Sequence, residues 1–249
     1  LAIINKIKEM EPNSEFLYIG TTNRMEKDLI PSMGYRYEGI EVTGFKRKLT
    51  LDNFKTITNF INAIKRCKII IKDFDPDIVI GCGGYVTAPV IYAAKKLGKK
   101  TFIHEQNSVV GLANKFLARY TDKIGVSFES TIKDFPKGKA ILTGNPCSEK
   151  ALSIKKTTKE KLDIAKDKKL VLIVMGSLGS RTINDKIFSF IDKFRSKNYS
   201  VIIVTGNSYY ERVKDKRVPS NVKVLPFIYE MPSVMKITDL MVTRAGAYE

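Results

Sequence analysis

The chain has few of the residues from which metal sites and membrane spans are built. It holds one histidine, His104, and three cysteines, Cys67, Cys82 and Cys147, which form no Cys-x-x-Cys pair. Zinc sites made of several imidazoles or paired thiolates are therefore excluded. An odd, scattered set of thiols is typical of a reducing, cytoplasmic compartment. No apolar run approaches the roughly 20 residues that a membrane-spanning helix requires.

Several nucleotide and nucleic-acid signatures are also missing. Neither the dinucleotide fingerprint G-x-G-x-x-G nor the P-loop G-x-x-x-x-G-K-[ST] occurs, so P-loop ATP hydrolysis is disfavoured. Without a zinc finger, an aromatic-basic RNA signature or a recognition helix, nucleic acid is not an expected partner. The net charge of +17 favours an anionic partner, although scattered lysines are equally typical of a solvated surface.

Two short β-branched runs each end in a glycine turn that opens a helix. The run at 77–80 leads into Gly81–Gly84, and the run at 170–175 leads into Gly176–Gly179. Such a turn directs backbone N–H groups and a helix dipole at one spot, which suits a phosphate. The alternative is a tight turn that needs glycine only for a positive φ. Two such turns predict two nucleotide-type domains that face a cleft.

Strand-like and helix-like segments alternate along the chain, which predicts α/β architecture with parallel sheets. The first half closes near Gly144-Asn145-Pro146, before a lysine-rich stretch with no strong strand pattern. We therefore expect two Rossmann-like domains, residues 1–146 and 147–249, in a fold that is truncated at both termini. The expected strands are 16–20, 40–42, 78–80, 100–104, 124–128, 140–142, 170–175, 201–205, 222–225 and 240–242. The expected helices are 1–9, 25–33, 51–74, 88–97, 111–120, 181–196 and 231–237.

Four polar residues, His104-Glu105-Gln106-Asn107, follow directly on a predicted strand. They fall at the carboxyl edge of the sheet, where open α/β sheets bind ligands. Polar side chains there are costly unless they pair with one another or with a substrate. Three interpretations stay open: a catalytic histidine, a structural His104–Glu105 pair and a binding role.

Five apolar residues, Phe54, Ile57, Phe60, Ile61 and Ile64, recur at helical spacing with basic residues nearby. An apolar stripe flanked by lysines can lie on an anionic bilayer surface. The same spacing is also typical of a helix that packs against the core.

Eight segments, taken in order, resemble one family. They are Gly83-Gly84-Tyr85-Val86-Thr87-x-Pro89, His104-Glu105-Gln106-Asn107, Gly111-Leu112-Ala113-Asn114, Gly144-Asn145-Pro146, Gly176-Ser177-Leu178-Gly179, Pro226-Phe227-Ile228, Asp239-Leu240 and Arg244-Ala245-Gly246-Ala247. They resemble the MurG family of bacterial peptidoglycan glycosyltransferases across nearly the whole chain. The most specific pair is His-Glu-Gln-Asn after a strand together with Gly-Gly-Tyr-Val.

This resemblance implies the two-domain GT-B fold and an inverting transfer with no bound metal and no cofactor. The implied substrates are UDP-N-acetylglucosamine and the lipid-linked muramyl-pentapeptide, and the product belongs to peptidoglycan synthesis. The implied location is the cytoplasmic face of the cell membrane, where the protein would bind an anionic lipid surface as a peripheral protein. The membrane contact would fall on the stripe from Phe54 to Ile64.

The resemblance also implies residue roles. The first domain would hold the lipid acceptor, and the second would hold the donor. The implied acceptor-binding residues are Gly83, Gly84, Tyr85 and His104. The implied donor-binding residues are Asn107, Gly176, Ser177, Gly179, Phe227, Ile228, Gly246 and Ala247.

Three departures from the family pattern limit what we expect of these 249 residues. The family's first strand and first glycine loop would precede Leu1, and this loop carries the family's proposed catalytic base. The catalytic base is therefore unknown here, and His104 and Glu105 are given organising roles. Ser148 stands where the family has a donor-binding arginine, and the later ribose-binding glutamate would follow Glu249. Low activity is therefore expected. The alternatives are another GT-B enzyme, a UDP-sugar epimerase, or a non-catalytic module that binds anionic membranes; a comparison of acceptors and of UDP affinity separates them.

Overall fold

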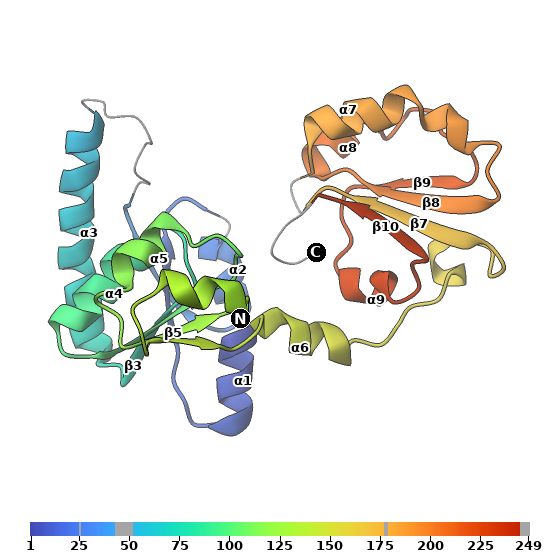
Figure 1. The fold of residues 1–249 in the computed structure, drawn as a ribbon. Helices are drawn as coiled ribbons and strands as arrows, with labels where there is room; N and C mark the ends of the chain where they lie inside the picture. The colour runs from blue at the N-terminus through green and yellow to red at the C-terminus, as the bar shows by residue number, and fades with distance from the viewer. Residues whose placement is uncertain (25, 43–51, 177–178, 245–249) are drawn as a thin grey trace. The chain divides into compact units, whose positions relative to one another are not determined.

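The computed structural model describes residues 1–24, 26–42, 52–176 and 179–244. The chain divides into two compact units, Leu1–Cys147 and Ser148–Glu249. Each unit consists of parallel strands and helices, as the α/β prediction expects (Figure 1). Among the described residues, no helix is long and apolar enough to cross a bilayer.

Unit 1 contains two sets of parallel strands. Four strands pair in the order β3-β4-β5-β6, while β1 and β2 pair only with each other. The strands are β1 (Leu17–Thr21), β2 (Arg36–Ile40), β3 (Ile78–Gly81), β4 (Lys100–Glu105), β5 (Lys123–Val126) and β6 (Ala140–Leu142). The helices are α1 (Ala2–Met10), α2 (Glu26–Ser32), α3 (Asp52–Phe74), α4 (Thr87–Lys96), α5 (Leu112–Leu117) and the 3₁₀ turn η1 (Glu129–Asp134).

The core of unit 1 forms where α3 and α4 cover the sheet. Ile91, Ile103, Leu117 and Ile124 are fully buried in it, and Cys67 of α3 lies among them. Burial raises the pKa of the Cys67 thiol to about 12, so this cysteine packs as a small apolar side chain rather than as a nucleophile.

Unit 2 has a single parallel sheet in the order β10-β7-β8-β9. Its strands are β7 (Lys169–Val174), β8 (Tyr199–Val204), β9 (Val222–Leu225) and β10 (Leu240–Thr243). The helices of this half of the chain are α6 (Pro146–Ser153), η2 (Glu160–Leu162), α7 (Arg181–Ser189), η3 (Ile191–Phe194), α8 (Asn207–Val213) and α9 (Met231–Met235).

The continuous apolar run of β7 is explained by burial on both faces of this sheet. Leu170, Leu172 and Val174 join one core cluster with Val234 of α9, whereas Ile173 joins a second cluster with α7. Figure 1 shows α7 and α8 on one face of the sheet and α9 on the other. Alternate residues of a strand point to opposite faces, so a strand covered on both sides needs apolar residues throughout.

Asp239, in the segment Asp239-Leu240, has a structural role at the start of β10. Its carboxylate accepts hydrogen bonds from Lys169 Nζ at 2.9 Å and from the Leu170 backbone N–H at 2.8 Å. The Lys169 contact comes first among the causes that hold the pKa of Asp239 well below its usual range. The carboxylate therefore joins β10 to the first residues of β7.

Two predicted elements differ clearly from the observed ones, and the helices α6 and α8 were not predicted. The strand expected at 40–42 runs instead over Arg36–Ile40, where only Ile40 is fully buried, so its apolar signal is weak. The helix expected at 181–196 ends at Ser189 and continues as the separate turn η3. Helix α8 was not predicted because it buries only Tyr209 and Val213, one turn apart.

Candidate functional site

Two neighbouring residues end β4 in unit 1 and have different partners. His104 is buried, and its Nε2 donates to the Gly144 carbonyl at 3.0 Å. The donor must be Nε2 because a carbonyl oxygen only accepts. A direct His104–Glu105 pair, one of the three interpretations left open, is therefore wrong, since consecutive strand residues point to opposite sides of the sheet. His104 ties β4 to the chain that follows β6.

Glu105 organises the loop that leaves β4. Its carboxylate is 1% exposed and accepts hydrogen bonds from the backbone N–H groups of Asn107 and Gly111 and from the side-chain amides of Asn107 and Asn114. Burial opposes ionisation, but these donors outweigh it and hold the pKa of Glu105 below its usual range. Asn107 itself is exposed on this loop.

The glycine turn after β3 lies beside this loop. Gly83 and Gly84 have φ values of 88° and 79°, so both need the left-handed conformation that glycine tolerates. A Cβ on Gly83 would lie 3.8 Å from the Gln106 side chain and 3.9 Å from Asn114 Nδ2, whereas the space beside Gly84 is open. The turn that carries the predicted acceptor-binding residues Gly83 and Gly84 thus lies against the loop that follows His104.

Arg24, which was not among the predicted site residues, lies at this edge of unit 1. Its guanidinium lies 5.1 Å from the ring centroid of Tyr85, which follows the glycine turn. Arg24 comes shortly after β1, so a cation at the carboxyl end of a predicted strand was the available signal. It adds positive charge next to Tyr85.

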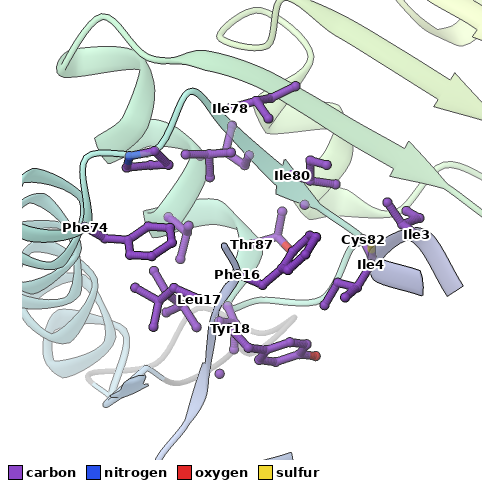
Figure 2. Close-up of a pocket in the computed structure, with 18 of the residues that line it drawn as sticks. Ile3, Ile4, Phe16, Leu17, Tyr18, Phe74, Ile78, Ile80, Cys82 and Thr87 are labelled. Carbon is purple, nitrogen blue, oxygen red and sulfur yellow. The ribbon is translucent and has the colours of Figure 1, made fainter. Parts of the chain in front are cut away.

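Unit 1 also contains a hollow of about 810 Å³ between β1 and β3. Its wall is mainly apolar and includes the strand residues 17–21 and 78–81 (Figure 2). Figure 2 shows Ile3 and Ile4 of α1 at its rim, with Phe16 and Phe74 within it. No residue of α1 is buried, although this helix turns apolar side chains to the hollow.

The second glycine turn, in unit 2, has a backbone geometry that requires glycine. Gly176 and Gly179 have φ values of 83° and 69°, and the Gly179 N–H donates to the Gly176 carbonyl at 3.0 Å. A Cβ on Gly179 would lie only 2.0 Å from the Thr205 carbonyl oxygen. The tight-turn alternative is thus sufficient for Gly179, and α7 begins two residues later with no side-chain cap on its first turn. Ser177 lies outside the described residues.

Arg244 lies at the same edge of unit 2. A Cβ on Gly176 would be 3.0 Å from Arg244 Nη2, and Arg244 follows β10, which pairs with β7. The sequence analysis placed Arg244 in a matching segment but gave it no role. Its exposed guanidinium is the cation next to the turn. Gly246 and Ala247 lie outside the described residues.

The segment after β9 presents aromatic side chains. The rings of Phe227 and Tyr229 meet edge to face, with centroids 5.2 Å apart, and both are exposed. Ile228 packs against the core cluster beneath the sheet. Ser148 is exposed on α6 and contributes no cation where the family has arginine.

The apolar stripe of α3 divides between core and surface. Phe60 and Ile64 pack against the core of unit 1, as the core alternative expects. Ile57 and Ile61 stay exposed at 46% and 47%. The side chain of Phe54 lies outside the described residues.

Helix α5 also exposes apolar side chains. The rings of Phe60 and Phe116 meet edge to face with centroids 6.4 Å apart, so α3 and α5 approach each other at these two residues. Leu112, one turn before Phe116, is 76% exposed; Lys115 is exposed on the same helix, and Arg119 is exposed two residues after its end. We call Ile57, Ile61, Leu112 and Phe116 the apolar patch. The sequence signal for its α5 half was too short to stand out.

The described residues contain no group of three or more His, Cys, Asp or Glu side chains placed to hold a metal ion. The polar groups at both sheet edges are therefore hydrogen-bond donors, acceptors and single cations.

Comparison with known proteins agrees with this geometry. Residues 1–126 match the glycosyltransferase family 28 N-terminal domain, and residues 170–248 match the glycosyltransferase family 28 C-terminal domain. A UDP-N-acetylglucosamine–N-acetylmuramyl-(pentapeptide) pyrophosphoryl-undecaprenol N-acetylglucosamine transferase of Bacillus cereus is 46% identical over 99% of this chain and 69% of its own length. The same-named protein of Listeria welshimeri is 43% identical over the same shares.

Solved structures give the same answer for the fold. MurG of Acinetobacter baumannii is 26% identical and superposes with a TM-score of 0.71 over 99% of this chain and 69% of its own. The UDP-GlcNAc 2-epimerase of Neisseria meningitidis, bound to UDP-GlcNAc, is 15% identical with a TM-score of 0.63, over 99% of this chain and 74% of its own. That second likeness shows the fold alone.

Two parallel-sheet α/β units with a glycine turn at the carboxyl edge of each sheet, together with the superposition on MurG and the two family matches, define a glycosyltransferase of the GT-B class. The predicted fold is confirmed. The chain belongs to glycosyltransferase family 28 and, within it, to the MurG transferases that carry the N-acetylglucosamine transferase name.

Proposed function

We propose that this chain transfers N-acetylglucosamine from UDP-N-acetylglucosamine to a muramyl-pentapeptide carried on undecaprenyl diphosphate. The observation that carries the proposal is the match to the named transferases over 99% of the chain. In the reaction, an acceptor hydroxyl loses its proton and attacks the sugar, and the bond between the sugar and the UDP diphosphate breaks with inversion. UDP leaves with an added negative charge, so the site must stabilise an anion.

Unit 2 is proposed to hold the UDP. The first turn of α7 has backbone N–H groups free of a side-chain cap, and the turn Gly176–Gly179 leads directly to it. These dipoles, with the Arg244 guanidinium beside Gly176, supply positive potential to the diphosphate without a metal. The half-buried side chain of Ile228 packs against the core, so its backbone is proposed to meet the uracil, next to the exposed ring of Phe227.

Arg244→Ala is expected to weaken UDP binding about tenfold to a hundredfold, because a charge-assisted contact to phosphate contributes roughly 1.5–3 kcal/mol. Isothermal titration of UDP measures the affinity. Arg195→Ala removes the same charge from an exposed site of unit 2, where Arg195 forms an ion pair with Asp192, and should leave UDP affinity unchanged. Equal affinities for the Arg244 variant and the unsubstituted chain would remove Arg244 from the donor site.

Unit 1 is proposed to hold the lipid acceptor at the Gly83–Gly84 turn. The open space beside Gly84 and the Arg24–Tyr85 pair offer room and positive charge to a diphosphate. His104 contributes by holding β4 to Gly144, since its Nε2–H is engaged there. No described residue is assigned as the base that removes the acceptor proton.

The apolar patch is proposed to seat unit 1 on the anionic cytoplasmic face of the cell membrane. Two exposed cations lie near its α5 half, Lys115 on the helix and Arg119 just after it, and the chain carries a net charge of +17. Apolar side chains that enter the acyl boundary, with cations at the headgroups, are what peripheral binding requires.

The hollow in unit 1 is proposed to take a further parallel strand rather than a nucleotide. Arg24 follows β1 and Tyr85 follows β3, and their contact places the carboxyl ends of these two strands at the same edge. Both strands border the hollow, and neither pairs with the other among the described residues. A strand between them would also cover the apolar face of α1.

Amide hydrogen exchange tests this assignment. In a parallel strand, alternate residues direct their N–H groups to each side, so every second amide of β1 and β3 is expected to exchange as an open edge does. The central strand β4 is the internal control, since it is paired on both sides. Full protection of β1 and β3 would show that the hollow is closed without an added strand.

A transfer assay separates the proposed activity from its alternatives. Label from UDP-N-acetylglucosamine is expected to appear in the lipid fraction only when the muramyl-pentapeptide lipid is present. Label that stays on UDP as an epimerised sugar would support an epimerase instead. Vesicle binding without measurable UDP affinity would indicate a non-catalytic membrane module.

A further inference from the structure

The buried carboxylate of Glu105 is held by neutral donors alone. Its Oε1 accepts from the Asn107 backbone N–H at 3.0 Å and from Asn107 Nδ2 at 2.8 Å. Its Oε2 accepts from the Gly111 N–H and from Asn114 Nδ2, both at 2.9 Å. No ion pair joins Glu105 to a cation in the described part of the chain. A buried charge without a counter-ion is costly unless every acceptor position is used.

Only a carboxylate suits this arrangement of donors. All four partners donate, two to each oxygen. A glutamine in the same place would turn its NH₂ group toward two of these donors, because one end of its amide cannot accept. Two buried donors that face each other both lack a hydrogen bond. Leaving a buried polar group unsatisfied costs more free energy than one hydrogen bond contributes to stability.

The two contacts to Asn107 fix which atom of its side chain is left free. Both the backbone N–H and Nδ2 of Asn107 are bound to the same oxygen of Glu105. The amide of Asn107 therefore cannot flip without losing a hydrogen bond. Among the described residues nothing donates to its Oδ1, and Asn107 is exposed. Its Oδ1 is thus an exposed acceptor at the carboxyl edge of β4, whereas the unpaired Oδ1 of Asn114 is buried.

We propose that Glu105 is a positioning residue that fixes the Asn107 amide, so that Asn107 Oδ1 accepts a hydrogen bond from a hydroxyl or amide N–H of the sugar substrate. This rests on the proposed function, which supplies the sugar. It also fixes the direction of the hydrogen bond, because the substrate group that contacts Asn107 Oδ1 must be the donor. A phosphate oxygen, which only accepts, would be repelled by Oδ1.

A purely structural role for Glu105 is the competing explanation. Through Gly111 and Asn114 the same carboxylate holds the start of α5 to β4, so its loss also destabilises unit 1. A drop in activity alone cannot separate the two explanations. A double-mutant cycle can, because residues that act through one another are not additive.

The cycle compares Glu105→Gln, Asn107→Ala and the double variant in the transfer assay. Glu105→Gln is expected to lower kcat about 10- to 100-fold and to change KM for UDP-N-acetylglucosamine less than about threefold, since misplacement of a substrate-orienting group acts on the reacting geometry. In the Asn107→Ala background, Glu105→Gln should lower kcat by less than about threefold more. Losses that multiply would overturn the proposal.

Asp122→Asn is the matched control for stability. Asp122 accepts hydrogen bonds from the Thr101 backbone N–H at 2.9 Å and from its Oγ1 at 2.8 Å, at the opposite end of the same strands. The variant therefore weakens a second carboxylate cluster without touching the Asn107 loop. It is expected to lower the thermal midpoint of unit 1 and leave kcat unchanged. A comparable loss of kcat in this variant would show that Glu105→Gln lowers kcat by destabilising unit 1.

Hydrogen exchange measured by NMR tests the contact between Glu105 and Asn107 without requiring turnover. The Asn107 backbone and Nδ2 protons should be protected in the unsubstituted chain, and Glu105→Gln should speed their exchange at least about tenfold, while Asp122→Asn should not. Exchange of both Asn107 groups at open-loop rates in the unsubstituted chain would overturn the proposal. Protected protons in a chain without any sugar transfer would support the contact and contradict the proposed function instead.

Discussion

Gly179→Ala is expected to destabilise unit 2 by about 3 kcal/mol and to abolish UDP binding at the same time. The φ of 69° alone costs a non-glycine residue roughly 1–3 kcal/mol. The added Cβ would also lie 2.0 Å from the Thr205 carbonyl oxygen, a backbone atom at the end of β8 that Asn184 holds by a hydrogen bond of 2.9 Å. Calorimetry should show a midpoint on the order of 15 °C lower for unit 2.

Gly138→Ala provides the control for backbone strain. Gly138 has a φ of 78° with no atom within 4 Å of the position of a Cβ, so only the conformational penalty, about 1 kcal/mol, applies. The difference between the two variants measures the steric contact of Gly179 with Thr205. If both variants lost the same stability, the close approach of this turn to β8 would be refuted.

The double variant Ile61→Glu, Leu112→Glu is expected to release the chain from anionic vesicles, with at least a 100-fold loss of partitioning. Burial of an isoleucine or leucine side chain contributes about 1.5–3 kcal/mol, and two such losses add to repulsion from the lipid charge. Both residues are exposed, so the folded state should be little affected. Co-sedimentation with mixed phosphatidylcholine and phosphatidylglycerol vesicles measures binding.

Met10→Glu, Leu152→Glu makes the same change of charge at two exposed apolar residues of α1 and α6, outside the apolar patch. This control variant should lose only the part of the vesicle affinity that comes from charge, which is smaller than the loss expected for the patch variant. Equal losses in the two double variants would show that net charge alone, and not the patch, holds the chain on the lipid.

Parallel α/β architecture could be predicted from the sequence because a strand buried on both faces has a distinctive pattern. The run from Leu170 to Val174 is apolar at every position, and the structure divides its side chains between two core clusters. β2 carries no such pattern, since only Ile40 is fully buried, and its position was misjudged by several residues. Where burial is partial, the sequence signal is weak.

The candidate site was only partly predictable for a different reason. The sequence identified the glycine turns and the polar segment after β4, because these depend on local residue types. The partners of His104 and Glu105 depend on strand geometry and on residues up to 40 positions away, such as Gly144. Arg244 near Gly176 follows from the pairing of β10 with β7, which no local pattern shows.

Proton–nitrogen NMR of the chain during titration with UDP tests the central proposal most directly, since it locates the nucleotide without requiring turnover. Shifts are predicted at the backbone amides of Gly176, Gly179 and Ile228 and at the Arg244 side chain, all at one edge of the unit 2 sheet. Shifts confined to residues around the hollow of unit 1, or no shifts at saturating UDP, would contradict the assignment of unit 2 as the donor-binding unit.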